Sequence, residues 1–302
     1  MSKQLIERIE KLKKERDAVI LAHNYQLPEV QDAADYTGDS LELSRIAAKS
    51  DKKIIVFCGV YFMAETASIL CPEKTILIPD PQAGCPMANM ITAEDVRELK
   101  ERYPRAIVVG YVNTPAEVKA ELDVCCTSTN AVDIVSKLKK TDEIIFVPDK
   151  YLADYVSKKT GRRLISWEGY CPTHVKILPE DIIKKIRQYP EAKVMVHPEC
   201  RPEVIELADE VLSTGKMCLY AKKSAEREFI VGTEVGIIHR LQKDNSGKKF
   251  YPASEHATCP NMKRTTLEKV LWSLEENKTE VRVCDEIRRR ARKALDKMVE
   301  LA

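Results

Sequence analysis

The chain lacks a charge excess, a long apolar run and a signal-peptide pattern. Its 49 lysines and arginines nearly balance 47 aspartates and glutamates, for a net charge of +2. That balance speaks against nucleic acid or a membrane surface as partner. A small anionic substrate remains compatible, because it needs only local donors. With no apolar run of membrane-spanning length, we expect a cytoplasmic protein.

Two kinds of motif are also missing. Neither GxxxxGK nor GxGxxG occurs, so nothing favours nucleotide binding. The ten cysteines contain no CxxC pair, which is the common pattern of a structural zinc site. In a long, charged chain, cysteines fit free thiols, metal ligands or catalysis better than a disulfide scaffold.

A Cys-Pro pair recurs at nearly equal spacing. Cys85, Cys171 and Cys259 are each followed by proline and lie 86 and 88 residues apart. Self-similarity at this period predicts homologous units that are each a small domain. The predicted domains are residues 1–88, 89–174 and 175–262, with residues 263–302 forming C-terminal helices that pack back on them.

Apolar strands alternate with amphipathic helices in every unit. This alternation predicts an α/β fold: three homologous three-layer αβα domains with short parallel sheets, arranged with pseudo-threefold symmetry around a central active site. Ligands of such sheets bind beyond the carboxyl ends of the strands. The expected strands are residues 18–22, 54–58, 75–78, 106–110, 144–147, 163–166, 193–196 and 229–231, with apolar residues at 250–251.

Equivalent loops of the three units carry different reactive side chains. The three sets are His23, Tyr111 and His197; Tyr25, Asn113 and Glu199; and Ser40, Ser128 and Ser213 with Thr214. Histidines can be structural and serines can simply cap helices. Their equivalence and loop placement favour function, and for the serines anion binding. Constant cysteines beside divergent neighbours are typical of three domains that share one metal and one asymmetric substrate.

The three recurring cysteines predict an iron–sulfur centre. Each following proline fixes its own φ and favours an extended residue before it, so the thiols should be presented alike. Three thiolates suit soft or borderline metals, and iron–sulfur clusters usually take four cysteines. We predict a [4Fe–4S] cluster whose open iron acts as a Lewis acid in dehydration or condensation. The other seven cysteines are expected to be small buried hydrophobes.

Several segments resemble the quinolinate synthase family over nearly the whole chain. They are residues 23–26, 38–40, 60–65, 84–88, 111–114, 126–130, 169–174, 197–200 and 232–234. The resemblance implies condensation of iminoaspartate with dihydroxyacetone phosphate to quinolinate, with release of phosphate and water, in NAD biosynthesis. It also implies a functional link to an aspartate oxidase or dehydrogenase that produces iminoaspartate.

The resemblance implies a role for each matched residue. Cys85, Cys171 and Cys259 hold the cluster, and Glu199, Tyr25 and His23 move protons. The substrate-binding residues are His23, Ser40, Tyr111, Asn113, Ser128, His174, His197, Glu199, Ser213 and Thr214. Some family members carry a CxxCxxC run near the C-terminus that is linked to redox control. Cys259 lies in no such run here, which speaks against that regulation.

Three alternatives share the same thiols. One is another three-cysteine [4Fe–4S] enzyme of pseudo-threefold build, either a diphthamide-forming enzyme or the terminal reductase of the methylerythritol phosphate isoprenoid route. The set of His23, Tyr25, Tyr111, Asn113 and Glu199 argues against both. A non-enzymatic iron or redox sensor would need a partner surface, and no basic DNA-reading helix is present. A structural zinc site is the third.

Overall fold

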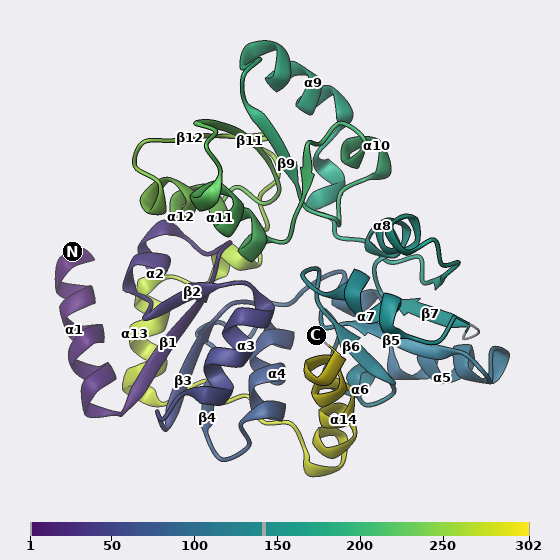
Figure 1. The fold of residues 1–302 in the computed structure, drawn as a ribbon. Helices are drawn as coiled ribbons and strands as arrows, with labels where there is room; N and C mark the ends of the chain where they lie inside the picture. The colour runs from purple at the N-terminus through teal and green to yellow at the C-terminus, as the bar shows by residue number, and fades with distance from the viewer. Residues whose placement is uncertain (1, 141–142, 302) are drawn as a thin grey trace.

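The computed structural model describes residues 2–140 and 143–301. Three four-stranded parallel sheets, each flanked by helices, form three lobes around a common centre (Figure 1). In every sheet the strand order is second, first, third, fourth along the chain. The predicted α/β class with three similar, short parallel sheets is confirmed.

The first sheet has the order β2-β1-β3-β4. Its central strand β1 is buried along its whole length, as expected for a parallel strand covered on both faces. β1 pairs with β3 from Ala18 opposite Ile54 to Ala22 opposite Cys58. The elements are α1 (Ser2–Glu15), β1 (Ala18–His23), α2 (Pro28–Ala33), β2 (Tyr36–Gly38), α3 (Ser40–Lys49), β3 (Ile54–Cys58), α4 (Tyr61–Leu70) and β4 (Thr75–Leu77).

The second sheet repeats this order as β6-β5-β7-β8. The strand β7 is an unbroken run of buried apolar residues. The elements are α5 (Ala93–Arg102), β5 (Ile107–Tyr111), α6 (Ala116–Lys119), β6 (Val124–Cys126), α7 (Ala131–Lys137), β7 (Ile144–Val147), α8 (Lys150–Thr160) and β8 (Ile165–Ser166).

The third sheet has the order β10-β9-β11-β12. Its buried core lies mainly between β9, β11 and the helices that cover them. The elements are α9 (Pro179–Gln188), β9 (Lys193–Val196), α10 (Pro202–Ile205), β10 (Glu210–Val211), α11 (Thr214–Lys223), β11 (Glu228–Gly232), α12 (Ile237–Asp244) and β12 (Lys249–Pro252).

Short strands beside the first strand of each sheet were not predicted. β2, β6 and β10 contain three, three and two residues. Such short segments show no apolar alternation of their own. They are extended because they pair with the first strand of their sheet, as Leu21 does with Tyr36.

Two helices close the chain and pack on the earlier units. α13 (Leu267–Glu276) lies against α1, and α14 (Asp285–Leu301) contacts β6, α6 and α4. The sequence predicts the second of these helices from Val281, whereas α14 begins at Asp285. The Val281 N–H donates to the Ile76 carbonyl oxygen, so this connection extends the edge of the first sheet before α14 begins.

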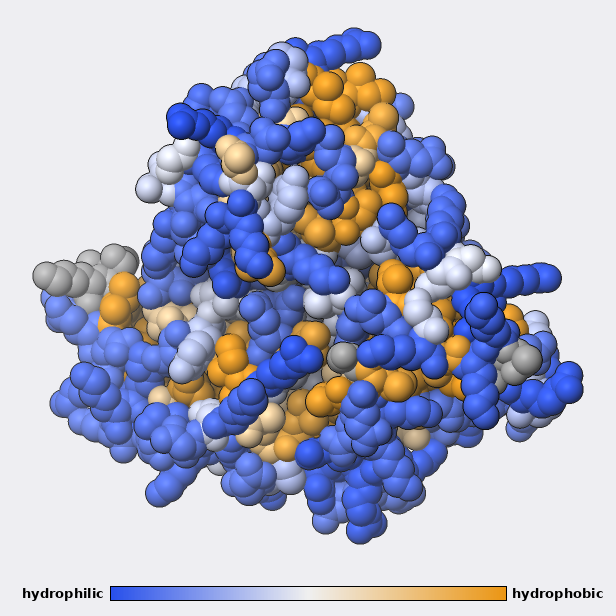
Figure 2. Space-filling model, viewed as in Figure 1, coloured by the Kyte–Doolittle hydropathy of each residue, from blue (hydrophilic) through white to orange (hydrophobic). Residues whose placement is uncertain are grey.

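The visible molecular surface is dominated by hydrophilic residues, with apolar residues showing between them (Figure 2). No helix in residues 2–140 or 143–301 combines the length and the apolar composition needed to cross a lipid bilayer.

Candidate active site

The carboxyl ends of the three sheets face one cavity. β1 ends at His23, β5 ends at Tyr111, and His197 directly follows β9. All three residues line the cavity, together with the predicted site residues Tyr25, Ser40, Cys85, Asn113, Ser128, Cys171, His174, Glu199, Thr214 and Cys259. The repeat therefore brings together residues that are far apart in the sequence, as loops at the carboxyl ends of parallel strands are expected to do.

Ser213 is the one predicted site residue that lies behind the cavity wall. Its hydroxyl caps α11 by accepting the N–H of Lys216, and it accepts a 2.7 Å hydrogen bond from the hydroxyl of Thr129. Ser213 thus supports the wall, whereas the adjacent Thr214 lines the cavity.

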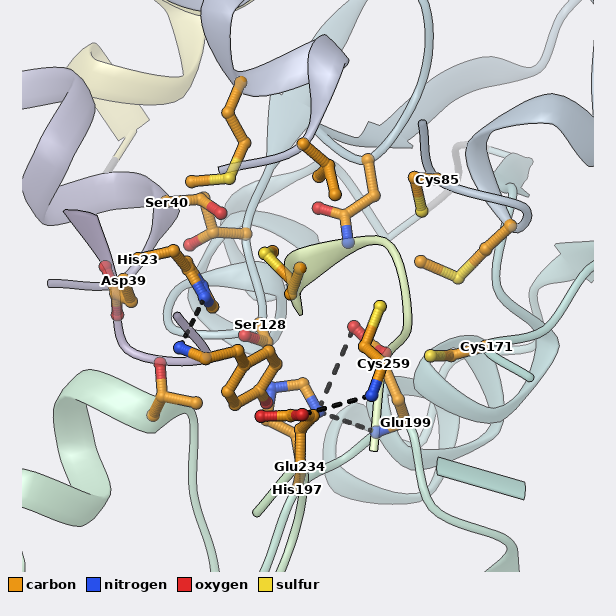
Figure 3. A pocket seen from close by; sticks show the side chains of 18 of the residues that line it. His23, Asp39, Ser40, Cys85, Ser128, Cys171, His197, Glu199, Glu234 and Cys259 are labelled. Carbon is orange, nitrogen blue, oxygen red and sulfur yellow. Dashed lines mark hydrogen bonds and ion pairs between the residues drawn. The ribbon is translucent and has the colours of Figure 1, made fainter. Parts of the chain in front are cut away.

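The thiols of Cys85, Cys171 and Cys259 lie on one side of the pocket, with their sulfur atoms directed toward a shared space (Figure 3). Each cysteine follows the fourth strand of its sheet and precedes a 3-10 turn. These turns are η1 (Ala88–Met90), η2 (His174–Lys176) and η3 (Met262–Arg264).

Each sulfur is met by backbone N–H groups of its own turn. They belong to the residues two and three positions after the cysteine, for example Met87 and Ala88 at Cys85. Hydrogen bonds of this kind stabilise a thiolate and tune the potential of an iron–sulfur cluster. All three sulfurs have backbone N–H donors at the same two positions after the cysteine, an arrangement that we call the cradle of each sulfur. The donor set therefore fits a thiolate-bound cluster.

The three thiols hold their protons until a cation binds. Burial raises the pKa of Cys85 to about 12 and raises the pKa of Cys171 and Cys259 above the ordinary thiol value. Since only the thiolate binds metal, metal uptake at these residues would release protons.

The spacing of the thiols does not suit a single zinc ion. Tetrahedral zinc, with Zn–S bonds of about 2.3 Å, keeps its sulfur ligands roughly 3.8 Å apart. In the described part of the chain, the set of three donors within 4.8 Å of one another is Cys171, His174 and Glu199, not the three cysteines. At least one pair of the three cysteine sulfurs is therefore more than 4.8 Å apart.

The remaining cysteines do not line the cavity. Cys58, Cys71, Cys125, Cys126 and Cys200 are buried. Cys71 is also followed by a proline, but it ends α4 and packs in the core. Cys218 is partly buried, and Cys284 is exposed, in contrast to the buried environment expected from the sequence.

Glu199 is buried among three polar partners. The Tyr111 hydroxyl donates to Oε1 at 2.7 Å. Nδ1 of His174 is 2.8 Å from Oε2, without the alignment of a hydrogen bond, and Nδ1 of His197 is 3.9 Å from Oε1. Burial raises the pKa of Glu199, but the neighbouring His174 and the hydrogen bond from the Tyr111 hydroxyl outweigh it, so the pKa of Glu199 is lowered. The residue is therefore a carboxylate, able to accept a proton.

His23 and His197 are neutral rings with the same backbone contact. Burial lowers the pKa of His23 to about 4 and that of His197 to about 3. Nδ1 of His23 accepts the N–H of Tyr25 at 3.2 Å, and Nδ1 of His197 accepts the N–H of Glu199 at 3.3 Å. A neutral ring that accepts at Nδ1 carries its proton on Nε2. Both rings can thus donate a hydrogen bond from Nε2.

Thr233 joins two of the predicted residues and was not itself predicted. Its hydroxyl lies 2.5 Å from the Tyr25 hydroxyl and 2.8 Å from Nε2 of His174. Because Nδ1 of His174 faces Glu199, the polar contacts run continuously from Glu199 to Tyr25. Burial and the charge of Glu199 raise the pKa of Tyr25, so its hydroxyl is protonated.

Residues at helix N-termini line the other part of the cavity. Ser40 and Thr214 are the first residues of α3 and α11, and Ser128 precedes α7. Backbone N–H groups at a helix N-terminus favour anions. In the lining there is no lysine or arginine among the residues that the structure describes.

Asp39 adds a negative charge to this part of the cavity, on the side opposite Cys85 and Cys171 (Figure 3). Its Oδ1 accepts the N–H groups of Leu41 and Glu42, and its Oδ2 accepts the hydroxyl of Thr129. These donors compensate its charge, and the N–H groups of Leu41 and Glu42 are already engaged by this cap.

Asn113 presents a buried polar atom that has no protein partner. Its side-chain oxygen makes no hydrogen bond to the residues that the structure describes. An unpaired buried acceptor of this kind costs about 1–3 kcal/mol. A ligand with an N–H or O–H group would remove that cost, which supports Asn113 as a contact for substrate.

Other lining residues escaped the sequence analysis because their role depends on tertiary packing. They are Asp39, Leu41, Val60, Phe62, Met63, Met87, Thr127, Thr129, Thr173, Glu234 and Met262. The repeat offered a signal for two of them, since Met87 and Thr173 occupy the same position after the cysteine. The apolar residues exclude water from one side of the cavity.

Acid pH is expected to destabilise the ligand-free protein through His197. Its pKa of about 3 lies below the ordinary histidine value of 6.5, so the unfolded chain binds a proton that the folded chain does not. Stability from this group is present above pH 6.5 and is lost as the pH falls toward 3. The free energy of unfolding, measured with urea, should fall with decreasing pH more steeply for the wild type than for His197→Asn. The difference in slope should be about 1.4 kcal/mol per pH unit.

The wild type must be compared with His197→Asn because Asp149 changes the pH dependence of stability in the opposite direction. Burial raises its pKa well above the ordinary value, so its contribution favours the folded state at lower pH. Equal slopes for the wild type and His197→Asn between pH ~6 and ~4 would contradict the buried neutral ring.

The chain matches a known family along nearly its whole length. Residues 7–300 match the family model described as quinolinate synthetase A protein. The chain is 59% identical over 294 residues to a quinolinate synthase of Dehalococcoides mccartyi, covering 97% of each chain. It is 54% identical to that of Methanosarcina barkeri over 98% of this chain and 97% of the other. Identity to the Thermodesulfovibrio yellowstonii protein is also 54%, over 100% and 99% of the two chains.

Proposed function

Because this chain belongs to the quinolinate synthase family of NAD biosynthesis, we propose that it condenses iminoaspartate with dihydroxyacetone phosphate to quinolinate. Phosphate and water are released, and the atoms balance without an oxidant or a reductant. The observation that carries the proposal is that three cradled thiols from equivalent loops line the same cavity as the ionised Glu199.

Cys85, Cys171 and Cys259 would hold a [4Fe–4S] cluster. When bound there, the cluster supplies an open iron that acts as a Lewis acid toward substrate oxygen or nitrogen. Each sulfur is met by backbone N–H groups of the two equivalent residues of its own turn, and the three sulfurs do not all lie within 4.8 Å of one another. Both observations support this donor set.

Glu199 is the base in this proposal. It is ionised and buried, and the Tyr111 hydroxyl holds it in place. A carboxylate in this setting removes protons during isomerisation, dehydration and ring closure. The contacts with His174 and Thr233 connect Glu199 to the protonated Tyr25 hydroxyl. Tyr25 can therefore give its proton to a substrate oxygen or nitrogen while Glu199 takes one from a substrate carbon.

His23 and His197 bind the polar groups of the substrates. Each neutral ring donates from Nε2, and Asn113 offers its unpaired side-chain oxygen. Iminoaspartate, which an aspartate oxidase or dehydrogenase would supply, carries two carboxylates that accept hydrogen bonds from the two rings and an imine N–H that can donate to the Asn113 oxygen.

The phosphate of dihydroxyacetone phosphate binds at the helix N-termini that begin with Ser40 and Thr214, near Ser128. Hydroxyl and backbone N–H donors hold it there without a basic side chain in the lining. The Ser128 hydroxyl also contacts the Tyr111 hydroxyl. Ser128 therefore links the phosphate site to Glu199 through Tyr111.

Ser40→Ala is expected to raise KM for dihydroxyacetone phosphate by roughly 10-fold, because one hydrogen bond to a charged group is worth about 1.5–3 kcal/mol. KM for iminoaspartate should change little. Steady-state kinetics in which each substrate is varied in turn provides the measurement.

Ser44→Ala serves as the matched control. Ser44 is one turn further along α3, and its hydroxyl donates to the Ser40 carbonyl oxygen instead of lining the cavity. A Ser40→Ala variant with unchanged KM for both substrates would remove Ser40 from the phosphate site.

The proposal is tested by anaerobic reconstitution with iron and sulfide, followed by an assay with the two substrates. Chromatography should detect quinolinate together with released phosphate. Protein without iron and protein loaded with zinc are the controls, and both should be inactive. A protein that is fully loaded with iron and makes no quinolinate would overturn the proposed function.

A further inference from the structure

Equivalent positions behind the three cysteine loops hold different residues. They are Val60, Asp149 and Glu234, each two positions after the third strand of its sheet. In every unit the N–H of the next residue donates to the carbonyl oxygen two residues before the cysteine. These bonds join Tyr61 to Ala83, Lys150 to Gly169 and Val235 to Ala257, at 2.8, 2.9 and 3.0 Å. The shared backbone contact establishes that the three positions are equivalent.

Glu234 is fully buried and contacts the Cys259 loop directly. Its Oε1 accepts the backbone N–H of Cys259 at 3.1 Å, and its Oε2 accepts the N–H of Gly236 at 2.7 Å. Nζ of Lys263 lies 2.9 Å from Oε1. The Glu234 carboxylate, just after β11, thus contacts Cys259 before the η3 turn and Lys263 within it.

Lys263 extends this contact to the loop of Tyr25. Its Nζ also donates to the carbonyl oxygen of Tyr25. Gly236 leaves room for the arrangement, since a Cβ there would lie 2.5 Å from Nζ of Lys263 and 2.7 Å from Oε2 of Glu234. The Cys259 loop and the Tyr25 loop are therefore both held by the ion pair of the buried Glu234 and the partly buried Lys263.

Asp149 has a related place in the second unit. It is fully buried, its Oδ1 caps α8 by accepting the N–H of Leu152 at 2.7 Å, and its carboxyl group faces the N–H of Cys171. Its Oδ2 has no hydrogen-bond partner among the described residues. In the first unit, Val60 offers no acceptor to Cys85. A carboxyl group therefore contacts the backbone N–H of the cysteine in two of the three loops, those of Cys171 and Cys259.

We propose that Glu234 is a positioning residue for the cluster ligand Cys259, with Asp149 as its counterpart at Cys171. A buried carboxylate beside thiolates adds repulsion and a desolvation cost. Its complete set of partners offsets that cost and fixes the backbone from which the sulfur projects. The inference rests on the proposed function in one respect only, namely that the three cysteines hold an iron–sulfur cluster.

The test compares full-length wild type, Glu234→Ala and Glu234→Gln after anaerobic reconstitution. Iron per chain and the rate at which a chelator removes iron are measured, together with thermal unfolding of the iron-free form. Glu234→Ala should lose iron about 10- to 100-fold faster, the usual effect of removing an outer partner of a metal ligand. Glu234→Gln should fall between it and the wild type, because its amide oxygen still accepts the Cys259 N–H.

Two further variants separate positioning from general destabilisation. Glu228→Gln removes a partly buried acid at the start of the same strand, where it pairs with Lys249 and accepts from the Tyr251 hydroxyl, and should behave as wild type. Ile230→Ala weakens the buried core of β11 without touching the Glu234 network. It shows how much faster iron is lost when only stability falls.

The proposal is overturned if Glu234→Ala loses iron at the wild-type rate. It is also overturned if that variant loses iron no faster than Ile230→Ala at equal stability of the iron-free form. Quinolinate formation is assayed in the same samples. A wild type that holds the cluster but makes no quinolinate refutes the proposed function alone, while one that takes up no cluster refutes both.

Discussion

Replacing Cys171 with alanine is expected to abolish both cluster binding and quinolinate formation. Cys171 supplies one of three thiols around a shared space, and its sulfur is cradled by the N–H groups of Thr173 and His174. Two remaining thiols cannot hold a cluster that normally takes four cysteine ligands. Iron content and the visible absorption of anaerobically reconstituted protein measure the loss, and activity should fall to background.

Parallel variants distinguish the cluster from the compact group of Cys171, His174 and Glu199. A cluster requires that Cys85→Ala and Cys259→Ala lose iron as Cys171→Ala does. A single ion on the compact group would survive both changes. Cys218→Ala is the control, because Cys218 is partly buried on α11 and does not line the cavity. Iron retained in Cys85→Ala would contradict the proposed ligand set.

Glu199→Gln is expected to lower kcat by about 10²- to 10⁴-fold, the usual contribution of a general base. Glutamine keeps the shape and can still accept from the Tyr111 hydroxyl, but it cannot take up a proton. Iron content should stay at the wild-type level, so the loss is separable from cluster damage. Steady-state kinetics together with the absorption spectrum of the same sample makes that distinction.

Glu203→Gln is the matched control for this variant. Glu203 is an exposed acid on α10 in the same unit and lies outside the cavity lining. Its replacement should leave kcat unchanged. A Glu199→Gln variant with nearly full activity and a full complement of iron would assign the base to another residue.

Much of the fold could be predicted because the central strands are short apolar runs that recur in each of the three units. Buried parallel strands such as β7, and β9 after Lys193, are continuous apolar runs, and the Cys-Pro spacing places them in equivalent units. The edge strands β2, β6 and β10 could not be predicted, because pairing with the central strand alone makes them extended. The late start of α14 has the same cause, since Val281 bonds to Ile76.

Some residues of the candidate site could be predicted from the sequence, and others depend on tertiary contacts. Residues at equivalent loop positions, such as His23 and His197, could be found by aligning the units. Thr233 and Glu234 lie in segment 232–234, which resembles the family, but their roles could not be predicted, because these depend on contacts with Tyr25, His174 and Cys259 that exist only in the folded chain. Ser213 is the opposite case, a residue that was predicted to contact a ligand and does not line the cavity. Its loop position suggested that contact, but its hydroxyl caps α11.

The central claim is that one iron of a cluster held by Cys85, Cys171 and Cys259 stays open for substrate. Mössbauer spectroscopy of protein reconstituted with ⁵⁷Fe, before and after addition of the substrates, tests it most directly. The account predicts that a single iron site of the [4Fe–4S] cluster changes its signal while the others keep theirs. A spectrum that is the same with and without substrates, or one from isolated iron ions, would contradict it.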